Sequence, residues 1–572
     1  MSSYHPLHDG WTLTAAEPTG PDGTLANLAT AQPVPATVPG CVHTDLLDAG
    51  LIPDPFLDDN EHALSWIGRT DWRYRTTFDW SGHGDRHVDL VCAGLDTVAT
   101  ITLNGERVGD SANMHRQYRF PVGDTLRPGT NTLEVHFESA YRYAERMRDR
   151  LGDRPNAYPE PFNFIRKMAS NFGWDWGLTL VTAGIWQPIG LHAWHEARLD
   201  EVRPLVTVER GEGRVRLHVR LQRPGTEPVR LRASVSGHGT RVDTDALVEP
   251  GRLDAELDLV VPDPRLWWPH GFGAPDRYDV ELHLSTVDGE ELDSWRRRVG
   301  FRSVRLDTGA DAIGSAYTIV VNDVPVFARG VNWIPDDVLV TRVDRARYER
   351  RLRQARDANV NYVRVWGGGI YETDDFYDTA DELGLMVGQD FPFACAAYPE
   401  EEPFATEVAA EAAQQIVRLA HHPSLLLWTG NNENLWGHED WGWRDKLDGR
   451  SWGSGYYFDL LPELVGRLDP TRPYWPGSPY SGTRELHPND ETHGSMHIWD
   501  VWNAEDYTRY RDYVPRFVAE FGYQAPPAYA TLRRAISDDP LTPSSPAMAG
   551  RQKAENGAGK LARGLAAHLP EP

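Results

Sequence analysis

Two glutamates of this sequence lie where buried strands are expected to end. Glu433 follows the apolar run SLLLWTG at 424–430, and Glu520 lies inside FVAEFG at 517–522. A third carboxylate, Asp390, ends the run LMVGQD. Paired carboxylates at neighbouring strand ends suit glycoside hydrolysis, in which one group is held protonated as the acid and the other is ionised as nucleophile or base.

The sequence motifs of several other chemistries are missing. The chain has no P-loop, no GxGxxG after a strand, no HExxH and no GxSxG. His421 and His422 precede a strand without a matching third ligand, so we interpret them as structural. The three glycines at 367–369 lack a following Lys or Ser/Thr in register, and we expect them to form a turn. We predict neither a metal site nor an organic cofactor.

The aromatic content is unusual, with 21 Trp, 22 Tyr and 17 Phe. Many of these residues stand beside Gly, Asn or Asp, as in GWDWG at 173–177 and WTGNNENLWG at 428–437. Aromatic faces pack on the C–H faces of sugars, while carboxylates and amides bind the hydroxyls. The aromatic pattern therefore favours a carbohydrate site over core packing alone.

Charge and cysteine content exclude several classes of partner. The formal net charge is −26, which argues against nucleic acid and against an anionic membrane surface, because both attract clustered Lys and Arg. No run of about 18 apolar residues is present, so we expect no membrane span. The three cysteines form no CxxC pair, and the N-terminus lacks a basic start with an apolar run. We therefore predict a soluble cytoplasmic protein.

The elements that must position the candidate residues fall into three segments. Residues 1–196 and 197–303 contain short alternating runs separated by turns, such as the Asn104-Gly105 hairpin signal, which predicts two β-sandwiches without a long helix. From 304 to 572 short apolar strands alternate with helical stretches such as 344–360 and 401–420, the pattern of a parallel barrel with its chemistry at the carboxyl ends of the strands. The predicted barrel strands are 326–332, 360–366, 385–390, 424–430, 474–478, 495–499 and 517–522.

Local motifs add a resemblance to a known family. They are VPGCVHTDLL (38–47), GLDTVATITLNG (94–105), NFGWDWG (171–177), RVWGGGIYE (364–372), WTGNNEN (428–434), RPYWPGSPYSG (472–482) and AEFGYQA (519–525). With the order of segments they resemble glycoside hydrolase family 2, and its β-mannosidase branch more than its β-galactosidase or β-glucuronidase branches. The resemblance implies a jelly-roll-like sugar-binding domain, an immunoglobulin-like sandwich and a (β/α)8 TIM-barrel catalytic domain.

The resemblance also implies an activity. It is that of a retaining hydrolase that removes terminal, non-reducing β-D-mannose by double displacement, with Glu433 as acid/base and Glu520 as nucleophile. Asn432 is expected to bind the 2-hydroxyl, and a loop of the first domain is expected to carry further sugar contacts into the barrel mouth. The remaining expected substrate contacts are Trp174, Asp175, Trp176, Trp366, His497 and Trp499.

Other functions stay open at this point. One is another family 2 hydrolase, such as a β-glucosaminidase or an endo-acting β-mannosidase of N-glycan cores. Another is an inactive carbohydrate-binding fragment, although both glutamates are present. The expected partner is an oligosaccharide with terminal β-mannose; the natural β-mannoside and the oligomeric state are not predicted.

The last segment departs from the family pattern. Residues 525–572 contain no Val, Phe or Trp and a single Ile, Ile536, so no buried parallel strand is expected there. We therefore expect a truncated barrel with seven strands, unpaired groups on strands 1 and 7, and weak or absent activity in this chain alone.

Overall fold

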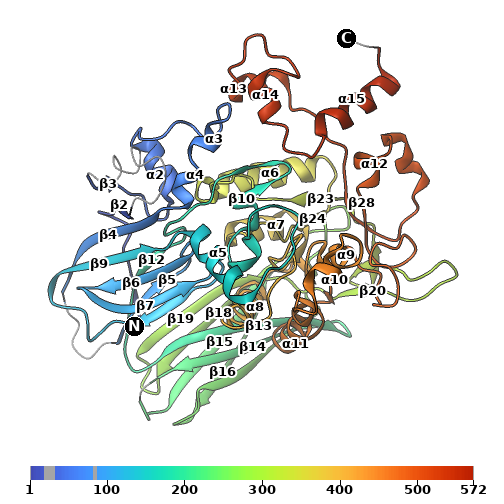
Figure 1. The fold of residues 1–572 in the computed structure, drawn as a ribbon. Helices are drawn as coiled ribbons and strands as arrows, with labels where there is room; N and C mark the ends of the chain where they lie inside the picture. The colour runs from blue at the N-terminus through green and yellow to red at the C-terminus, as the bar shows by residue number, and fades with distance from the viewer. Residues whose placement is uncertain (1, 18–31, 82–86, 224, 571–572) are drawn as a thin grey trace.

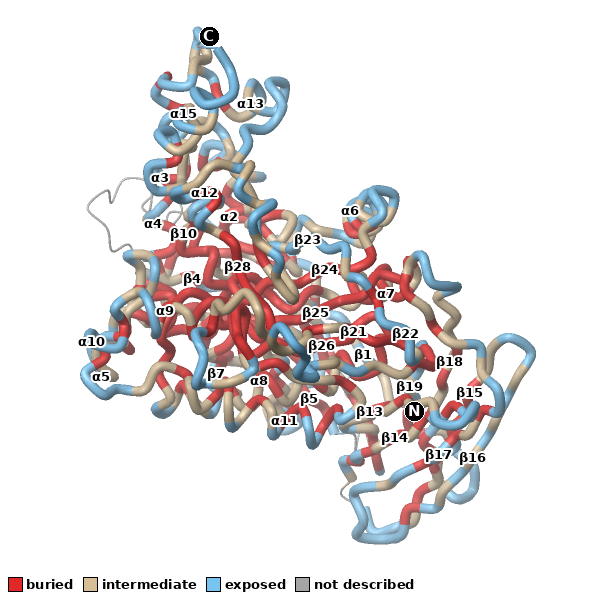
Figure 2. The backbone as a smooth tube through the Cα atoms, turned by 90° about the vertical axis from the view of Figure 1, so that its right-hand side faces the viewer, coloured by how far each residue is buried: buried red, intermediate tan, exposed pale blue. Residues whose placement is uncertain are grey.

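Two β-sandwiches and an α/β region follow one another along the chain (Figure 1). The computed structural model describes residues 2–17, 32–81, 87–223 and 225–570. The backbone is most buried where the three regions meet, whereas the ends of the second sandwich and the last helices lie at the periphery (Figure 2).

The first sandwich consists of a four-stranded sheet and a six-stranded sheet, ordered β1-β12-β5-β8 and β3-β2-β4-β9-β6-β7. In β4, Trp72 and Tyr74 are buried while Arg73 and Arg75 are exposed, the two-residue period of a half-buried strand. The strands are β1 (Ser3–Pro6), β2 (Thr12–Glu17), β3 (Val34–Pro35), β4 (Asp71–Trp80), β5 (His87–Cys92), β6 (Val98–Leu103), β7 (Glu106–Ala112), β8 (Tyr118–Pro121), β9 (Gly129–Phe137) and β12 (Ile189–Trp194).

One predicted turn of this sandwich is confirmed. Asn104 and Gly105 join β6 to β7, and both have the positive φ values (54° and 85°) that a type I′ hairpin turn requires.

The prediction of a first segment without a long helix is wrong. Helix α5 (Ala140–Leu151) begins after Ser139, whose hydroxyl accepts a backbone N–H of the first turn, and it buries Tyr141, Ala144 and Met147 on one face. The helix was missed because its remaining positions are mostly charged and it lies between two β segments, so its few apolar residues did not form a clear helical pattern. Shorter helices of the first region are α2 (Val42–Asp48), α3 (Asn60–Ala63) and α4 (Ser65–Gly68).

The second sandwich is immunoglobulin-like and antiparallel, with sheets ordered β13-β14-β17 and β16-β15-β18-β19. Its inner faces form one cluster of buried Val and Leu side chains. The strands are β13 (Arg198–Glu209), β14 (Glu212–Gln222), β15 (Val229–Gly237), β16 (Thr240–Val248), β17 (Asp254–Pro262), β18 (Tyr278–Thr286) and β19 (Glu291–Val299).

The α/β region contains all seven predicted barrel strands, each shorter than its sequence run. Five of them form a parallel sheet ordered β23-β24-β25-β26-β27, and β28 pairs in parallel with β29. They are β23 (Gly330–Trp333), β24 (Tyr362–Val365), β25 (Met386–Asp390), β26 (Leu425–Thr429), β27 (Tyr474–Trp475), β28 (Met496–Ile498) and β29 (Val518–Phe521). A small antiparallel sheet precedes them: β20 (Val304–Asp307), β21 (Thr318–Val321) and β22 (Val324–Val326).

Helices connect the parallel strands. The two helical stretches expected from the sequence are α6 (Arg345–Asp357) and α8 (Phe404–Leu419). The other regular helices between the strands are α7 (Asp374–Leu383), α9 (Asn434–Asp440), α10 (Trp443–Leu447), α11 (Leu461–Leu468) and α12 (Asp500–Asn503).

The barrel is open between its first and last strands. Over the described residues β23 pairs only with β24, β29 pairs only with β28, and no strand follows β29 as far as residue 570. Side chains that border this opening are exposed, including Phe327 (81%), Val514 (80%) and Phe521 (60%). The described chain after β29 forms α13 (Tyr529–Ala535), α14 (Pro546–Gly550) and α15 (Gly557–His568), as expected for a segment without strand-forming residues.

Candidate functional site

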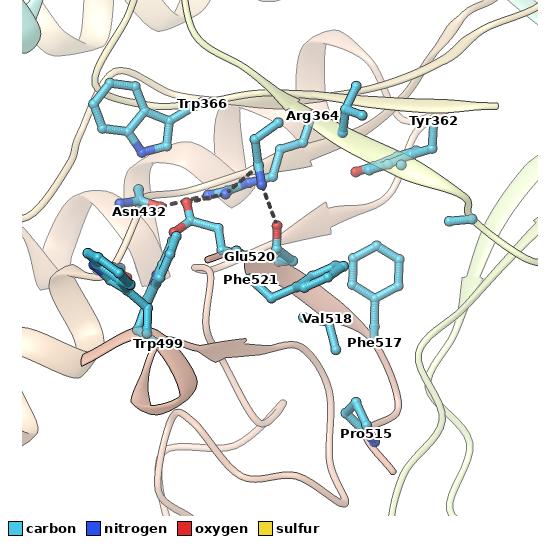
Figure 3. Close-up of a pocket in the computed structure, with 18 of the residues that line it drawn as sticks. Tyr362, Arg364, Trp366, Asn432, Trp499, Pro515, Phe517, Val518, Glu520 and Phe521 are labelled. Atoms are coloured by element: carbon cyan, nitrogen blue, oxygen red, sulfur yellow. Dashed lines mark hydrogen bonds and ion pairs between the residues drawn. The ribbon is translucent and has the colours of Figure 1, made fainter. Parts of the chain in front are cut away.

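A cavity of about 1850 Å³ lies at the carboxyl ends of the parallel strands and extends to the open side of the barrel. Eight of the nine residues that the sequence singled out line it, and the ninth, His497, contacts two of them. Figure 3 shows part of its wall, with Arg364, Asn432, Trp499 and Glu520 close together. The predicted residues therefore form one site although they come from widely separated parts of the chain.

The two glutamates form the centre of this site. Their side chains are 10% and 9% exposed, and the nearest carboxylate oxygens of Glu433 and Glu520 lie within 4.8 Å of each other. His497 joins them, since its Nδ1 lies 2.9 Å from Oε1 of Glu433 and 3.3 Å from Oε2 of Glu520. Its Nε2 also makes a hydrogen bond of 2.7 Å with the Ser478 hydroxyl, so both ring nitrogens have partners.

Glu433 is held by backbone bonds to the neighbouring strand ends. The preceding residue, Asn432, donates its N–H to Phe393 O and accepts one from Cys395 N, which ties the loop after β26 to the loop after β25. Glu433 N donates to Ser478 O, beyond β27. Glu433 itself adopts a left-handed backbone (φ 63°), a conformation costing about 1 kcal/mol that directs its side chain into the cavity instead of along α9.

Glu520 lies among donors to its ionised form. Arg364 Nη1 donates to Oε1 at 2.6 Å, and Trp499 Nε1 donates to Oε2 at 3.0 Å. Burial alone would raise the pKa of Glu520, but the charges of His497 and Arg364 and the hydrogen bonds outweigh it, so its pKa lies below the ordinary value. The geometry therefore favours an ionised Glu520.

Arg364 links four strand ends and was missed from the sequence. Besides Glu520, its guanidinium donates to Asp390 Oδ2 (2.7 Å), Asn432 Oδ1 (2.8 Å) and Asn332 Oδ1 (3.0 Å). Asp390, noted as a strand-end carboxylate, is fully buried in this ion pair and is absent from the cavity wall. A signal was available, because an arginine inside the apolar run VNYVRVW must find buried partners.

The first sandwich contributes a hairpin to the cavity. Strands β10 (Phe172–Trp174) and β11 (Gly177–Thr179) pair so that Asp175 and Trp176 form its tip. Trp174 packs edge-on against Trp366 at 4.8 Å between ring centroids, and Trp176, 45% exposed, contacts the same ring at 5.6 Å. Burial by the surrounding walls, then the charges of Glu433 and Glu520, raise the pKa of Asp175.

Further cavity residues were not anticipated. Cys395 donates its thiol hydrogen to Glu433 Oε2 at 3.2 Å, and Trp436, Trp441 and Tyr158 add aromatic wall. Nothing in the sequence indicated this contact, since the approach of Cys395 to Glu433 depends on the loop after β25.

Family models match the two sandwiches: the Glycosyl hydrolase 2 galactose-binding domain-like model covers residues 11–187, and the Glycosyl hydrolases family 2 model covers residues 198–302. A crystal structure of β-D-mannosidase from Dictyoglomus thermophilum superposes with a TM-score of 0.92 at 37% identity, over 100% of this chain and 69% of that chain. The chain belongs to glycoside hydrolase family 2.

Two curated relatives are named beta-mannosidase. Beta-mannosidase B of Thermothelomyces thermophilus is 34% identical over 93% of this chain, and the Bos taurus beta-mannosidase is 32% identical over 94%. The chain spans 65% and 64% of the length of these two relatives.

Two clusters of the described residues could in principle hold a cation. One is Glu433, His497 and Glu520, whose ligand atoms are already engaged by Arg364, Trp499, Cys395 and each other. The other is formed by Asp378, His421 and His422, in which Nδ1 of His422 is 2.7 Å from Asp381. The contact with Asp381 agrees with the structural role predicted for this histidine pair. That the protein needs no metal or cofactor stays a prediction.

Within the described residues, no helix combines the length and apolar composition needed to cross a bilayer.

Proposed function

We propose that this family 2 member is a retaining exo-β-D-mannosidase that hydrolyses terminal, non-reducing β-D-mannose residues. The observation that carries the proposal is the pair of nearly buried carboxylates with oxygens within 4.8 Å. Retaining glycosidases have carboxyl groups about 5–5.5 Å apart, whereas inverting ones need about 6.5–9.5 Å to admit a water. The mannose assignment is supported by relatives named β-mannosidase.

Two displacements follow from this arrangement. In the first, ionised Glu520 attacks the anomeric carbon while Glu433 gives its proton to the glycosidic oxygen, which leaves with the aglycone as an alcohol. In the second, Glu433 takes a proton from water, the water oxygen attacks the anomeric carbon, and the bond to Glu520 breaks to release mannose. Arg364 and Trp499 keep Glu520 ionised and oriented before the first displacement.

The proposed substrate contacts surround this pair. Asn432, oriented by Arg364, binds the 2-hydroxyl, which is axial in mannose, and this contact strengthens in the transition state. Asp175, at the tip of the hairpin, binds further hydroxyls. Trp174, Trp176 and Trp366 form the wall that limits cleavage to chain ends.

A rate panel tests the assignment. Initial rates are measured on chromogenic β-mannoside, β-glucoside, β-galactoside and β-glucosaminide, with Glu520→Ala as the blank. We expect the β-mannoside to be fastest. A faster rate on any other glycoside assigns a different family 2 activity. No rate above the blank on all four refutes the proposed activity for this chain and agrees with the weak or absent activity expected of a seven-stranded barrel.

We also propose domain boundaries at 196/197 and 303/304. The first falls between β12, which ends at Trp194, and β13, which begins at Arg198; the second falls between β19 and β20. A reducing, cytoplasmic setting is a further proposal, supported by three buried cysteines without disulfides.

A further inference from the structure

The segment after β29 returns to the first sandwich beside the site. The loop before α3 receives it, where Asp58 N donates to Ala535 O at 2.8 Å. The Asp58 carboxylate accepts from the N–H and hydroxyl of Ser537, both at 2.7 Å. These bonds, the backbone bond first, lower the pKa of Asp58. Hydrogen bonds thus join the loop at Asp58 to the segment at 535–537, far apart in the sequence.

The strongest link in this contact is a buried charge pair. Glu61 in α3 has a side chain only 2% exposed, and its Oε1 accepts from Lys553 Nζ. Its other oxygen, Oε2, accepts the backbone N–H of Thr179 at 2.7 Å. Thr179 ends β11, the second strand of the hairpin that carries Asp175 and Trp176. Glu61 therefore bridges Lys553 and the hairpin, since one of its oxygens binds Lys553 and the other binds Thr179.

The residues flanking Lys553 are attached to the barrel. The amides of Gln552 and Gln524 exchange two hydrogen bonds of 3.0 Å, and Gln524 lies four residues after Glu520. Ala554 N donates to Gln552 Oε1 at 3.3 Å, and both Ala554 and Gln524 line the cavity. Residues 552–554 thus contact the barrel side of the site on one flank and, through Glu61, are connected to the hairpin on the other.

We propose that Lys553 is a positioning residue that fixes the base of the hairpin, and with it Asp175 and Trp176, relative to Glu520 through its ion pair with Glu61. This inference rests on the proposed function, because it assigns Asp175 and Trp176 to the sugar that Glu520 attacks. Next to the tip, Trp174 pairs with Gly177 and packs on Tyr158 and Phe162. At the base, Thr179 pairs with Phe172, and Glu61 holds this end through the Thr179 N–H.

Loss of the lysine charge has a definite physical consequence. In Lys553→Met the Glu61 carboxylate is buried without its cation, and among the contacts above it keeps only the hydrogen bond from Thr179 N–H. Because an unpaired buried charge is unfavourable, a movement of the carboxylate toward water lowers the free energy. That movement breaks the bond to Thr179 and loosens β11. Lys553→Arg keeps the charge and should retain the position.

Hydrogen exchange measures this coupling without any turnover. In the 572-residue protein, the peptide covering 172–180 should exchange about ten-fold faster or more in Lys553→Met than in wild type, since a hydrogen bond to a charged group is lost. Glu61→Gln, which keeps an acceptor but loses the charge, should show a smaller increase. Lys553→Arg and the exposed Lys446→Met should match wild type, as should the β6–β7 hairpin in every variant. Unchanged exchange of 172–180 in both Lys553→Met and Glu61→Gln overturns the proposal.

Kinetics on the chromogenic β-mannoside test the consequence for the site. We expect KM to rise about five- to twenty-fold in Lys553→Met with kcat within about three-fold of wild type, because the hairpin binds the glycone while Glu433 and Glu520 stay in place. The Glu61→Gln/Lys553→Met double variant should be no worse than the Lys553→Met single variant. An equal fall in kcat and kcat/KM, or additive effects, contradicts a positioning role. A wild-type chain without β-mannosidase activity refutes the proposed function instead, and the exchange result still decides the coupling.

Discussion

Replacement of Arg364 by methionine removes the cation on which the centre of the site depends. Met fills a similar volume without charge, so Glu520 and Asp390 lose bonds of 2.6 and 2.7 Å, and the amides of Asn432 and Asn332 lose bonds of 2.8 and 3.0 Å. Breaking a buried ion pair by removing one partner costs about 3–5 kcal/mol, and Arg364 has two such partners. We expect the free energy of unfolding of the barrel to fall by at least that amount.

The same substitution should change catalysis through Glu520. Loss of a charge-assisted hydrogen bond of about 1.5–3 kcal/mol corresponds to a fall of about 10- to 150-fold in kcat/KM on a β-mannoside. Because Arg364 lowers the pKa of Glu520, its removal raises that pKa, and the acid limb of the kcat/KM profile should move to higher pH.

The contribution of Glu520 to the free energy of unfolding should also decrease as the pH falls. The folded-state pKa of Glu520 lies below its unfolded value, so its contribution is present above the unfolded pKa and is lost as pH falls through the folded pKa. In Arg364→Met the folded pKa moves towards the unfolded value, so this contribution should shrink and its loss should be complete at higher pH than in wild type.

Thermal melting and kcat/KM, each measured across pH, check these expectations. Arg364→Lys keeps the charge but not the planar fork, and should fall between wild type and Arg364→Met. Arg298→Met, at an exposed pair with Asp279, serves as the matched control and should change neither quantity. An unshifted acid limb together with unchanged melting in Arg364→Met would refute the role assigned to this arginine.

Four other perturbations test the proposed residue roles and the open side of the barrel. Glu433→Ala should slow a poor alkyl leaving group far more than an activated aryl one, because only the former needs a proton; equal losses would argue against the acid/base role. Glu520→Ala should abolish turnover of both substrates, and residual covalent turnover would contradict its assignment as nucleophile. Asp175→Asn should lower kcat/KM on a β-mannoside with unchanged melting, and wild-type kinetics would remove the hairpin from the site. Phe327→Ser with Val514→Ser should reduce binding of the dye ANS to the open side of the barrel, and an unchanged signal would place the dye elsewhere.

Much of the fold could be predicted because each element repeats a local pattern. Most expected barrel strands are apolar runs that end at or just before Gly, Asp or Asn, and the strands that contain Arg364 and Asp390 are buried along their whole length. Helix α5 was missed because its apolar stripe is narrow and its other face is charged. The composition of this segment alone therefore did not predict a helix.

The site was predictable where a residue type and a strand end coincide, as for Glu433 and Glu520. The residues that contact these glutamates and orient them were not predictable, because they depend on which loops meet in the folded chain. Arg364 gathers groups from four strand ends, and Lys553 meets Glu61 across 492 residues. No window of sequence contains both members of such a pair, so only the folded arrangement reveals them.

The central claim is that Glu520 forms a covalent bond to mannose. Incubation with 2-deoxy-2-fluoro-β-D-mannosyl fluoride, followed by mass spectrometry of the digested protein, tests it most directly, since one slow turnover suffices. We predict one added fluoromannosyl group on the peptide that contains Glu520, and none in Glu520→Ala. An adduct on another residue, or β-mannoside hydrolysis by a protein that never becomes labelled, would contradict the account.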